Sequence, residues 1–382
     1  MAEALRLGHT YKGRTAPNPA VGAVVVRDGE IIGRGAHAKA GGPHAETIAL
    51  AQAGGGANRA TLYVTLEPCA HHGRTPPCAN AVAAAGIARV VIGTLDPNPA
   101  VAGKGAALLA AAGVDVTIGV YERRSRHLVE DFASAVVRGR PWVTAKYAMS
   151  LDGKLATRAG DSKWITGEAA RRFAHQLRSE HGAVVVGKNT VGRDDPRLTA
   201  RPEDHPSASR PVRIVVTSEG DIPTAAALWE ATPAPIWVAC TGAISRSAVK
   251  RLTESGAEVI RCEGERGKVS LDSLLRNVAA RGINSLLVEG GGELLGGFFD
   301  ADLVDRVVAF VAPVVIGGRG AVPAVGGKGV TAIANAFRLR EVTRRRYGDD
   351  LCVDGYVVDV NEFFAHVAAP TREFKGRGRR RA

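Results

Sequence analysis

Alternating apolar and polar runs predict strands and helices that follow one another along the first third of the chain. The segment VGAVVVRDGEIIGRGAH, from Val21, has apolar runs on either side of Asp28-Gly29, a dipeptide typical of hairpin turns. A helix is predicted from about His44 to Ala53, where a glycine run ends it. The strands ATLYVTLEPC, ARVVIGTLD and VDVTIGV alternate with the helices CANAVAAAG and GKGAALLAAAG. This alternation predicts a layered α/β sheet covered by helices.

The pattern restarts near Pro141, within VVRGRPWVTAK, and predicts a second α/β domain. A strand ends near Tyr147, and a helix covers about Glu168 to His181. Further strands are AVVVG, PVRIVVTS, PIWVAC and INSLLVEGGG, and the last of them leads into a helical ELLGGFF. The two halves do not resemble each other, so the sequence does not predict an internal repeat.

Length and composition agree with two folded domains, which we expect at residues 1–140 and 141–366. A chain of 382 residues exceeds one average domain, and 45% hydrophobic with 23% charged residues is typical of a soluble globular protein. No apolar run reaches the roughly 20 residues that span a membrane. The N-terminus does not have the pattern of a secretion signal. We therefore expect a cytoplasmic protein without membrane contact.

The net charge of +12 raises the question of nucleic acid. The last twelve residues, TREFKGRGRRRA, carry six basic side chains and one acidic, and so contribute +5. Because this segment has no apolar periodicity, we predict a solvated, disordered tail at 367–382, with a weak polyanion contact as the alternative.

Four residues together indicate a zinc site. Five cysteines without framework spacing argue against a disulfide scaffold and leave metal or thiol chemistry. Taken singly, His44, Glu46, Cys69 and Cys78 each have an ordinary structural interpretation. Together they have the H-x-E…P-C…C form of the zinc nucleobase deaminases. Three ligands, His44, Cys69 and Cys78, leave a fourth tetrahedral position open for water, whereas a structural zinc module usually closes with four protein ligands.

The predicted chemistry is hydrolytic deamination with one Zn²⁺ per chain. Two thiolates and a neutral imidazole leave the metal electrophilic, and a helix N-terminus helps to keep Cys78 ionised. Glu46 is not a ligand in this pattern and can carry a proton from the water to the ring nitrogen and the leaving ammonia.

The loop between the cysteines separates subfamilies. A C-x-x-C deaminase would need cysteine at position 72, where this chain has His72 within CAHHGRTPPC. The blocks APNPAVGAVVV, GPHAE, VTLEPCAHHGRTPPC and DPNPAVAGKG resemble the deaminase domain of the bifunctional deaminase/reductases of riboflavin biosynthesis. This resemblance implies a cytidine-deaminase-like three-layer α/β/α domain, with Asn18, His37 and Arg74 contacting a ribose-phosphate pyrimidine. We assign His71 and His72 to the loop or to substrate rather than to the metal.

The remaining blocks WVTAKYAMSLDGKLAT, GDSKWITGEAARRFAHQLR, VGKNTVGRDDPRLTAR and LLVEGGGELLGGFF resemble the family's reductase domain. The resemblance implies a dihydrofolate-reductase-like α/β fold and NADPH as cofactor. By themselves, Gly290, Gly292 and Gly296 give G-x-G-x-x-x-G, which lacks the ordinary dinucleotide fingerprint. The glycine pattern alone fits either a phosphate cradle or a tight structural turn.

The resemblance also assigns residues of the second domain. Those implied to hold NADPH are Ala148, Trp164, Thr190, Asp194, Ser218, Gly291, Gly292, Glu293, Leu294, Leu295, Gly296 and Gly297. Those implied to hold substrate are Ser162, Arg178, Leu198, Arg201 and Glu289, of which Arg178 and Arg201 suit a phosphate because guanidinium groups bind it bidentately. Hydride would pass from the cofactor to C1′ of the ribosylamine. Lys146, Asp194 and Glu289 remain alternative proton sources.

The resemblance therefore implies a two-domain enzyme of riboflavin biosynthesis. The first domain would deaminate 2,5-diamino-6-ribosylamino-4(3H)-pyrimidinone 5′-phosphate, and the second would reduce 5-amino-6-(5-phosphoribosylamino)uracil to its ribityl form. We expect small pyrimidine ribose phosphates as partners and no specific nucleic acid. The sequence is compatible with a homo-oligomer. The alternative is a nucleic-acid-editing deaminase, which the basic tail favours. The long cysteine loop and the lack of interleaved aromatic residues argue against it.

Overall fold

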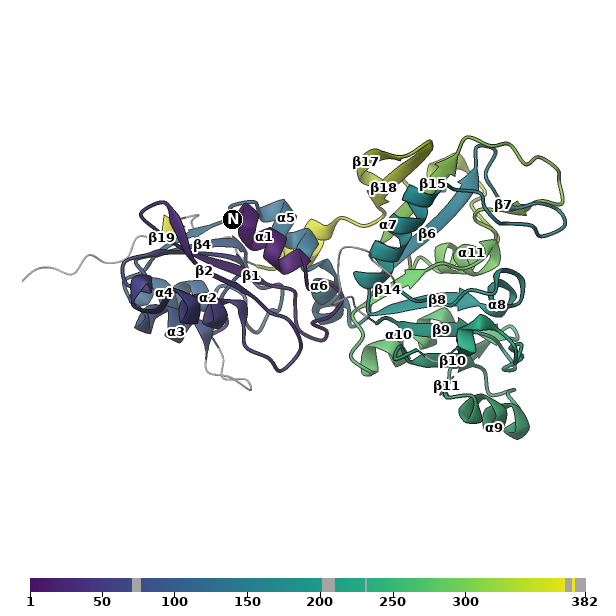
Figure 1. Cartoon of the computed structure of the whole chain (residues 1–382), viewed down its shortest axis with the longest axis horizontal. Coiled ribbons are helices and arrows are strands. Elements are labelled where there is room, and N and C mark those ends of the chain that lie inside the picture. The colour runs from purple at the N-terminus through teal and green to yellow at the C-terminus, as the bar shows by residue number, and fades with distance from the viewer. Residues whose placement is uncertain (71–76, 201–209, 231, 368–372, 375–382) are drawn as a thin grey trace, which may run out of the picture. The chain divides into compact units, whose positions relative to one another are not determined.

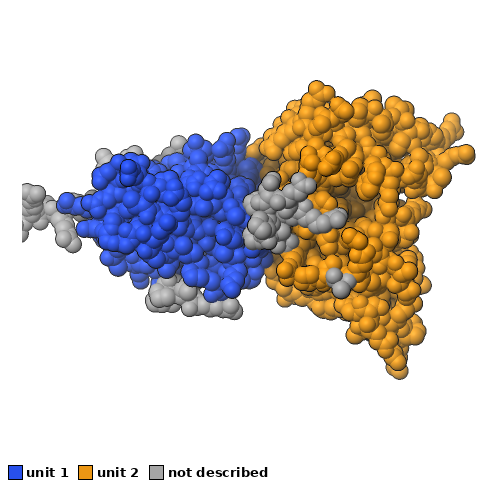
Figure 2. Space-filling view, viewed as in Figure 1, with its two compact units in different colours: residues 1–139, 360–382 blue, residues 140–359 orange. Residues whose placement is uncertain are grey.

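The computed structural model describes residues 1–70, 77–200, 210–230, 232–367 and 373–374. It divides the chain into two compact units, Met1–Gly139 with Val360–Ala382, and Arg140–Asp359 (Figure 2). Within the described ranges, no helix is both long and apolar enough to cross a membrane.

The first unit is built on a six-stranded sheet with helices on both faces. Its strand order is β19-β5-β4-β3-β1-β2, with β3, β4 and β5 parallel and the other pairs antiparallel. In Figure 1, α1 and α5 cover one face and α2, α3 and α4 cover the other. The bounds are β1 Gly22–Arg27, β2 Glu30–Ala36, β3 Thr61–Leu66, β4 Arg89–Thr94, β5 Asp115–Ile118, β19 Glu373–Phe374, α1 Ala2–His9, α2 Ala45–Ala53, α3 Cys78–Ala84, α4 Lys104–Ala111, α5 Glu122–Leu128 and α6 Glu130–Arg138.

Two sequence predictions are confirmed in this unit. Asp28 and Gly29 have φ of 51° and 84°, as a tight turn between right-twisted strands requires, and they join β1 to β2. The three-layer α/β/α arrangement is also confirmed.

The second unit has a nine-stranded, mostly parallel sheet, as a dihydrofolate-reductase-like α/β fold does. Its order is β11-β10-β9-β8-β14-β6-β15-β18-β17, and only β15, β18 and β17 pair antiparallel. The strands are β6 Trp142–Ser150, β8 Ala183–Gly187, β9 Val212–Val216, β10 Ile236–Cys240, β11 Ala257–Arg261, β14 Ser285–Val288, β15 Arg306–Ala312, β17 Arg340–Tyr347 and β18 Asp350–Tyr356.

Helices cover both faces of this sheet, and each face has its own apolar core. Leu274 of α10 and Phe298 of α11 belong to one core, whereas Leu177 of α7 and Leu252 of α9 belong to the other. The helices are α7 Glu168–Ser179, α8 Lys188–Asp194, α9 Arg246–Glu254, α10 Leu271–Ala280 and α11 Gly292–Asp300. The parallel neighbours β8, β14 and β6 end at the same edge of the sheet, where ligands of open α/β sheets bind.

The chain returns to the first unit near its end. A short 3₁₀ helix at Val360–Phe364 packs on α5 and α6, where the guanidinium of Arg138 lies 4.5 Å from the ring centre of Phe363. Residues 360–366, which the sequence analysis gave to the second domain, therefore group with the first unit. Of the predicted tail 367–382, residues 368–372 and 375–382 lie outside the described residues.

Candidate active sites

Three potential metal ligands meet at one edge of the first sheet. His44 precedes α2, Cys78 is the first residue of α3, and Cys69 follows β3. Their ligand atoms all lie within 4.8 Å of one another. His44 Nδ1 is 3.1 Å from Cys78 Sγ and 3.7 Å from Cys69 Sγ, and the Cys78 N–H donates to Cys69 Sγ at 3.3 Å. One nitrogen and two sulfur donors this close together suit a tetrahedral zinc ion with one free position.

The environment of the cluster shifts the pKa values of its two thiols in opposite directions. A hydrogen bond from Cys78 lowers the pKa of the Cys69 thiol to about 4, whereas the pKa of Cys78 is raised by the same contact and by burial. One thiol of the pair is therefore ionised at neutral pH, and the thiolate is the form that binds metals.

Glu46 lies in the first turn of α2, two residues after His44, and only 4% of it is exposed. Burial raises the pKa of its carboxyl to about 7. A carboxyl with a pKa near 7 can both take up and release a proton at neutral pH, which is what a general acid-base group requires.

Asn18 and His37 lie beside the ligand cluster. The rings of His37 and His44 have their centres 5.4 Å apart in an edge-on arrangement. His37 Nδ1 is 3.0 Å from the carbonyl of Pro43, which can only accept, so Nδ1 carries the hydrogen and Nε2 accepts from Asn18 Nδ2 at 3.1 Å. Burial lowers the pKa of His37, which favours this neutral form. Arg74, His71 and His72 lie outside the described residues.

Glu67 is a residue of this site that the sequence analysis missed. Its buried carboxylate accepts hydrogen bonds from the backbone N–H groups of Asp96 at 3.1 Å, Gly103 at 2.9 Å and Ala106 at 3.0 Å. It thereby joins the loop that holds Cys69 to the start of α4. The signal in the sequence is only its place two positions before Cys69, because the fold brings its partners to it from 29 to 39 positions away.

Gly105 of α4 packs directly against this loop. A Cβ atom there would lie 1.9 Å from the carbonyl oxygen of Pro68, the residue before Cys69. We expect Gly105→Ala to destabilise the first unit by about 1–3 kcal/mol, the usual cost of overpacking, and to lower its zinc content. Chemical denaturation and metal analysis would check this, with Gly55→Ala as the matched control, since a Cβ on Gly55 would have open space around it and that residue does not have a positive φ. Full zinc content together with unchanged stability would contradict it.

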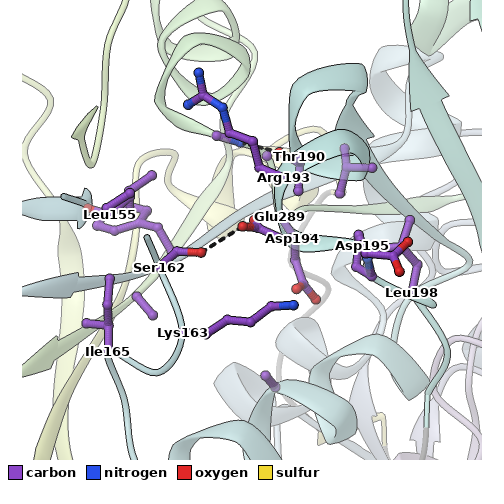
Figure 3. A pocket seen from close by; sticks show the side chains of 18 of the residues that line it. Leu155, Ser162, Lys163, Ile165, Thr190, Arg193, Asp194, Asp195, Leu198 and Glu289 are labelled. Atoms are coloured by element: carbon purple, nitrogen blue, oxygen red, sulfur yellow. Dashed lines mark hydrogen bonds between the residues drawn. The ribbon is translucent and has the colours of Figure 1, made fainter. Parts of the chain in front are cut away.

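A cavity of about 750 Å³ opens at the carboxyl ends of β6, β8 and β14 in the second unit (Figure 3). Nine of the residues predicted for cofactor or substrate line it: Ala148, Ser162, Trp164, Arg178, Thr190, Asp194, Leu198, Glu289 and Gly291. These residues come from six separate segments of the chain. Their convergence makes this cavity the candidate reductase site.

Glu289 and Arg178 form a bidentate ion pair in the cavity wall. Arg178 Nε and Nη2 donate to the two Glu289 oxygens, each at 2.8 Å, and Arg178 Nη1 donates to the Thr199 carbonyl at 3.1 Å. Lys146 Nζ lies 3.7 Å from Glu289 Oε2. Burial alone would raise the pKa of Glu289, but Arg178 and then Lys146 lower it to about 2. The carboxylate is therefore ionised, and it pairs with the guanidinium that was predicted to clamp a phosphate.

Two further hydrogen bonds join cavity residues from different segments. Ser162 Oγ donates to Asp194 Oδ1 at 2.7 Å, drawn as a dashed line in Figure 3. The Gly291 N–H donates to Thr190 Oγ1 at 3.1 Å and fixes the start of α11 against α8.

Two glycines of the predicted glycine-rich segment, Gly292 and Gly296, are buried. A Cβ on Gly292 would lie 2.4 Å from the Pro323 carbonyl oxygen, and one on Gly296 would lie 2.3 Å from the Gly326 backbone. These glycines therefore allow close packing of α11 on a neighbouring loop, and their predicted contact with the cofactor stays a prediction. The predicted residues outside the cavity lining are Ser218, Gly292, Glu293, Leu294, Leu295, Gly296 and Gly297, and Arg201 lies outside the described residues.

Comparisons with known proteins cover nearly the whole chain. Residues 141–353 match the model of the RibD C-terminal domain, and residues 1–94 match the cytidine and deoxycytidylate deaminase zinc-binding region. The riboflavin biosynthesis protein RibD of Aquifex aeolicus is 45% identical over 353 residues, which is 92% of this chain and 96% of that protein. RibD of Escherichia coli is 38% identical over 365 residues, which is 92% of this chain and 97% of that protein.

Two solved structures are similar over the same extent. Acinetobacter baumannii RibD has a TM-score of 0.81 at 36% identity, and the match covers 93% of this chain and 97% of that one. The diaminohydroxyphosphoribosylaminopyrimidine deaminase/5-amino-6-(5-phosphoribosylamino)uracil reductase of Thermotoga maritima has a TM-score of 0.80 at 36% identity, with the same coverage.

Proposed function

The chain belongs to the RibD family of bifunctional deaminase/reductases of riboflavin biosynthesis, and we propose that each of its two units supplies one of the two active sites. The first unit deaminates 2,5-diamino-6-ribosylamino-4(3H)-pyrimidinone 5′-phosphate. The second reduces 5-amino-6-(5-phosphoribosylamino)uracil to its ribityl form. The observation that carries the deaminase assignment is the cluster of His44, Cys69 and Cys78 with Glu46 beside it.

In the first unit, His44, Cys69 and Cys78 hold one zinc ion. Zinc held by these ligands supplies a Lewis acid that lowers the pKa of a water toward 7. Glu46 would take one proton from the attacking water and pass it to the pyrimidine nitrogen, and would then carry the second proton of that water to the departing amine. Asn18 and His37 orient the pyrimidine. The hydrogen bond between Asn18 Nδ2 and His37 Nε2 holds the two side chains together, and the His37 ring lies beside that of His44.

In the second unit, the cavity holds NADPH and the ribosylamino-pyrimidine together. Its volume of about 750 Å³ lies within the usual range for a ligand pocket. Thr190 and Gly291 contact the cofactor phosphates, while Ser162, Leu198 and Glu289 contact the substrate. NADPH bound there would supply hydride for the reduction of the ribosyl group, and Lys146, Asp194 and Glu289 remain the candidate proton sources.

The proposal is tested with the purified chain and the diamino-pyrimidinone phosphate. Without NADPH, we expect ammonia release and accumulation of the deaminated pyrimidine. Addition of NADPH should then lead to NADPH oxidation and a ribityl product, identified by mass spectrometry. Ammonia release without later NADPH oxidation would overturn the reductase assignment, and NADPH oxidation only with a supplied deaminated pyrimidine would overturn the deaminase assignment.

A further inference from the structure

We propose that Lys163 and Arg193 recognise the phosphate groups of the two reductase ligands, Lys163 that of the pyrimidine ribose phosphate and Arg193 those of NADPH. This inference rests on the proposed reductase function, and it assigns two residues that the sequence analysis did not single out. Both side chains line the cavity and are labelled in Figure 3.

The cavity lining carries more positive than negative charge. Among the described residues, its six cationic side chains are Lys146, Lys163, Arg171, Arg178, Arg193 and Arg197, and its four carboxylates are Asp194, Asp195, Glu230 and Glu289. The difference is two positive charges. A cavity with such an excess attracts anions, and both ligands of the proposed reaction are phosphates.

Four of the six cations already have partners. Lys146 and Arg178 face Glu289, as described above, and Arg197 Nε lies 2.9 Å from Glu230 Oε2. The Arg171 guanidinium lies 4.6 Å from the ring centre of Trp164 and donates to the Thr166 carbonyl at 2.7 Å. These four are therefore held by groups of the protein.

Lys163 and Arg193 differ from the other four. Within the part of the chain that the structure describes, their charged groups have no carboxylate, carbonyl or aromatic partner. Both side chains are exposed, so they are accessible to an incoming ligand. Arg178 is paired with Glu289, and Arg201 lies outside the described residues, so Lys163 and Arg193 are the cations of the described lining whose donors are available to a phosphate.

The position of Lys163 assigns it to the pyrimidine substrate. It follows Ser162 in the chain, and in Figure 3 its side chain extends across the view toward the side of Leu198. Ser162 and Leu198 are both proposed substrate contacts. An ammonium group in the same cavity lining as these two contacts can meet the 5′-phosphate of the substrate.

The position of Arg193 assigns it to the cofactor. It lies three residues after Thr190 on α8, so the two side chains share one face of the helix. Thr190 accepts a hydrogen bond from Gly291 at the start of α11, which is the proposed phosphate contact of NADPH. In Figure 3 the Arg193 side chain extends away from Lys163, on the side of Thr190. The two unpaired cations therefore serve different ligands.

The test measures steady-state NADPH oxidation by the full chain with the deaminated pyrimidine phosphate, varying one ligand while the other is saturating. We expect Lys163→Ala to raise KM for the pyrimidine by about three- to ten-fold, with kcat and KM for NADPH nearly unchanged. Arg193→Ala should raise KM for NADPH by a similar factor and leave KM for the pyrimidine nearly unchanged. Lys163→Arg should keep most of the affinity, and both effects should shrink at high salt because the contacts are exposed.

Lys250→Ala and Arg246→Ala are the matched controls, because each removes one exposed charge from α9, away from the cavity lining. A wild-type chain that does not oxidise NADPH would overturn the proposed function itself. An active wild-type chain in which Lys163→Ala and Arg193→Ala behave like these controls would overturn only the present inference. If both variants weakened binding of the same ligand, the separate assignments would be wrong.

Discussion

Replacement of Glu46 by glutamine is expected to slow deamination by about 10²- to 10⁴-fold, the usual contribution of general acid-base catalysis, without loss of zinc. The cluster of metal-ligand atoms is formed by His44, Cys69 and Cys78 and does not include this carboxyl. Burial raises the pKa of Glu46 to about 7, so the group can exchange a proton in either direction near neutral pH. Glutamine has nearly the same shape but cannot accept that proton.

The experiment compares three quantities on one preparation of the variant. Ammonia release reports deamination, zinc per chain reports the integrity of the cluster, and NADPH oxidation with the already deaminated pyrimidine reports the second unit. Zinc per chain and the rate of NADPH oxidation should equal those of the wild type. Glu30→Gln removes an exposed carboxylate at the start of β2 and is the matched control. Loss of zinc would make Glu46 part of the ligand set, and an unchanged rate of ammonia release would remove it from the mechanism.

The proximity of the zinc-cluster residues could be predicted from the sequence because local signals place each of them. His44 and Cys78 stand where helices begin, and Cys69 follows a strand that pairs with the hairpin strand β1. Helix starts and strand ends are the features that short sequence patterns indicate most directly. The fold class could be predicted for the same reason, since strands and helices alternate along both units.

The pairing of Arg178 with Glu289 could not be predicted in this way. The two residues are 111 positions apart and come from α7 and from the loop after β14. A sequence pattern gives the charge of each residue but not which opposite charge the fold brings to it. The same holds for Gly292 and Gly296, whose role depends on the approach of the loop around Pro323 and Gly326. The return of Val360–Phe364 to the first unit is likewise a long-range contact without a local signal.

Removal of the Arg178 guanidinium is expected to destabilise the second unit by about 3–5 kcal/mol, the cost of leaving a buried carboxylate without its partner. The Arg178 and Glu289 side chains are 15% and 8% exposed, and two hydrogen bonds of 2.8 Å join them. Lys146, at 3.7 Å, is left to face the carboxylate but cannot replace the two parallel hydrogen bonds. Arg178→Met retains much of the apolar stem and removes the charge.

Tryptophan fluorescence can follow this unit alone, because all four tryptophans, Trp142, Trp164, Trp229 and Trp237, belong to Arg140–Asp359. Urea denaturation of wild type, Arg178→Met, Glu289→Gln and the double variant gives a double-mutant cycle. The double variant should be less destabilised than the sum of the single variants, because it leaves no unpaired charge on either residue. Arg172→Met, on the exposed face of the same helix, is the matched control. Additive single effects would show that the two side chains do not stabilise each other.

The pH dependence gives this prediction a second, independent measurement. The pKa of Glu289 is about 2 in the folded protein against an ordinary value of 4.5, so the pair's stabilisation is fully present above pH 4.5. It is lost as pH falls toward 2, because over that range the unfolded chain binds a proton that the folded chain does not. In wild type, Glu289 takes up as much as one proton on unfolding in this range. Its contribution to the slope of the free energy of unfolding against pH is therefore up to about 1.4 kcal/mol per pH unit. In Arg178→Met the folded pKa of Glu289 should rise, and most of that slope between pH 4.5 and 2 should disappear. An unchanged slope in the variant would mean that Arg178 does not hold Glu289 in its ionised form.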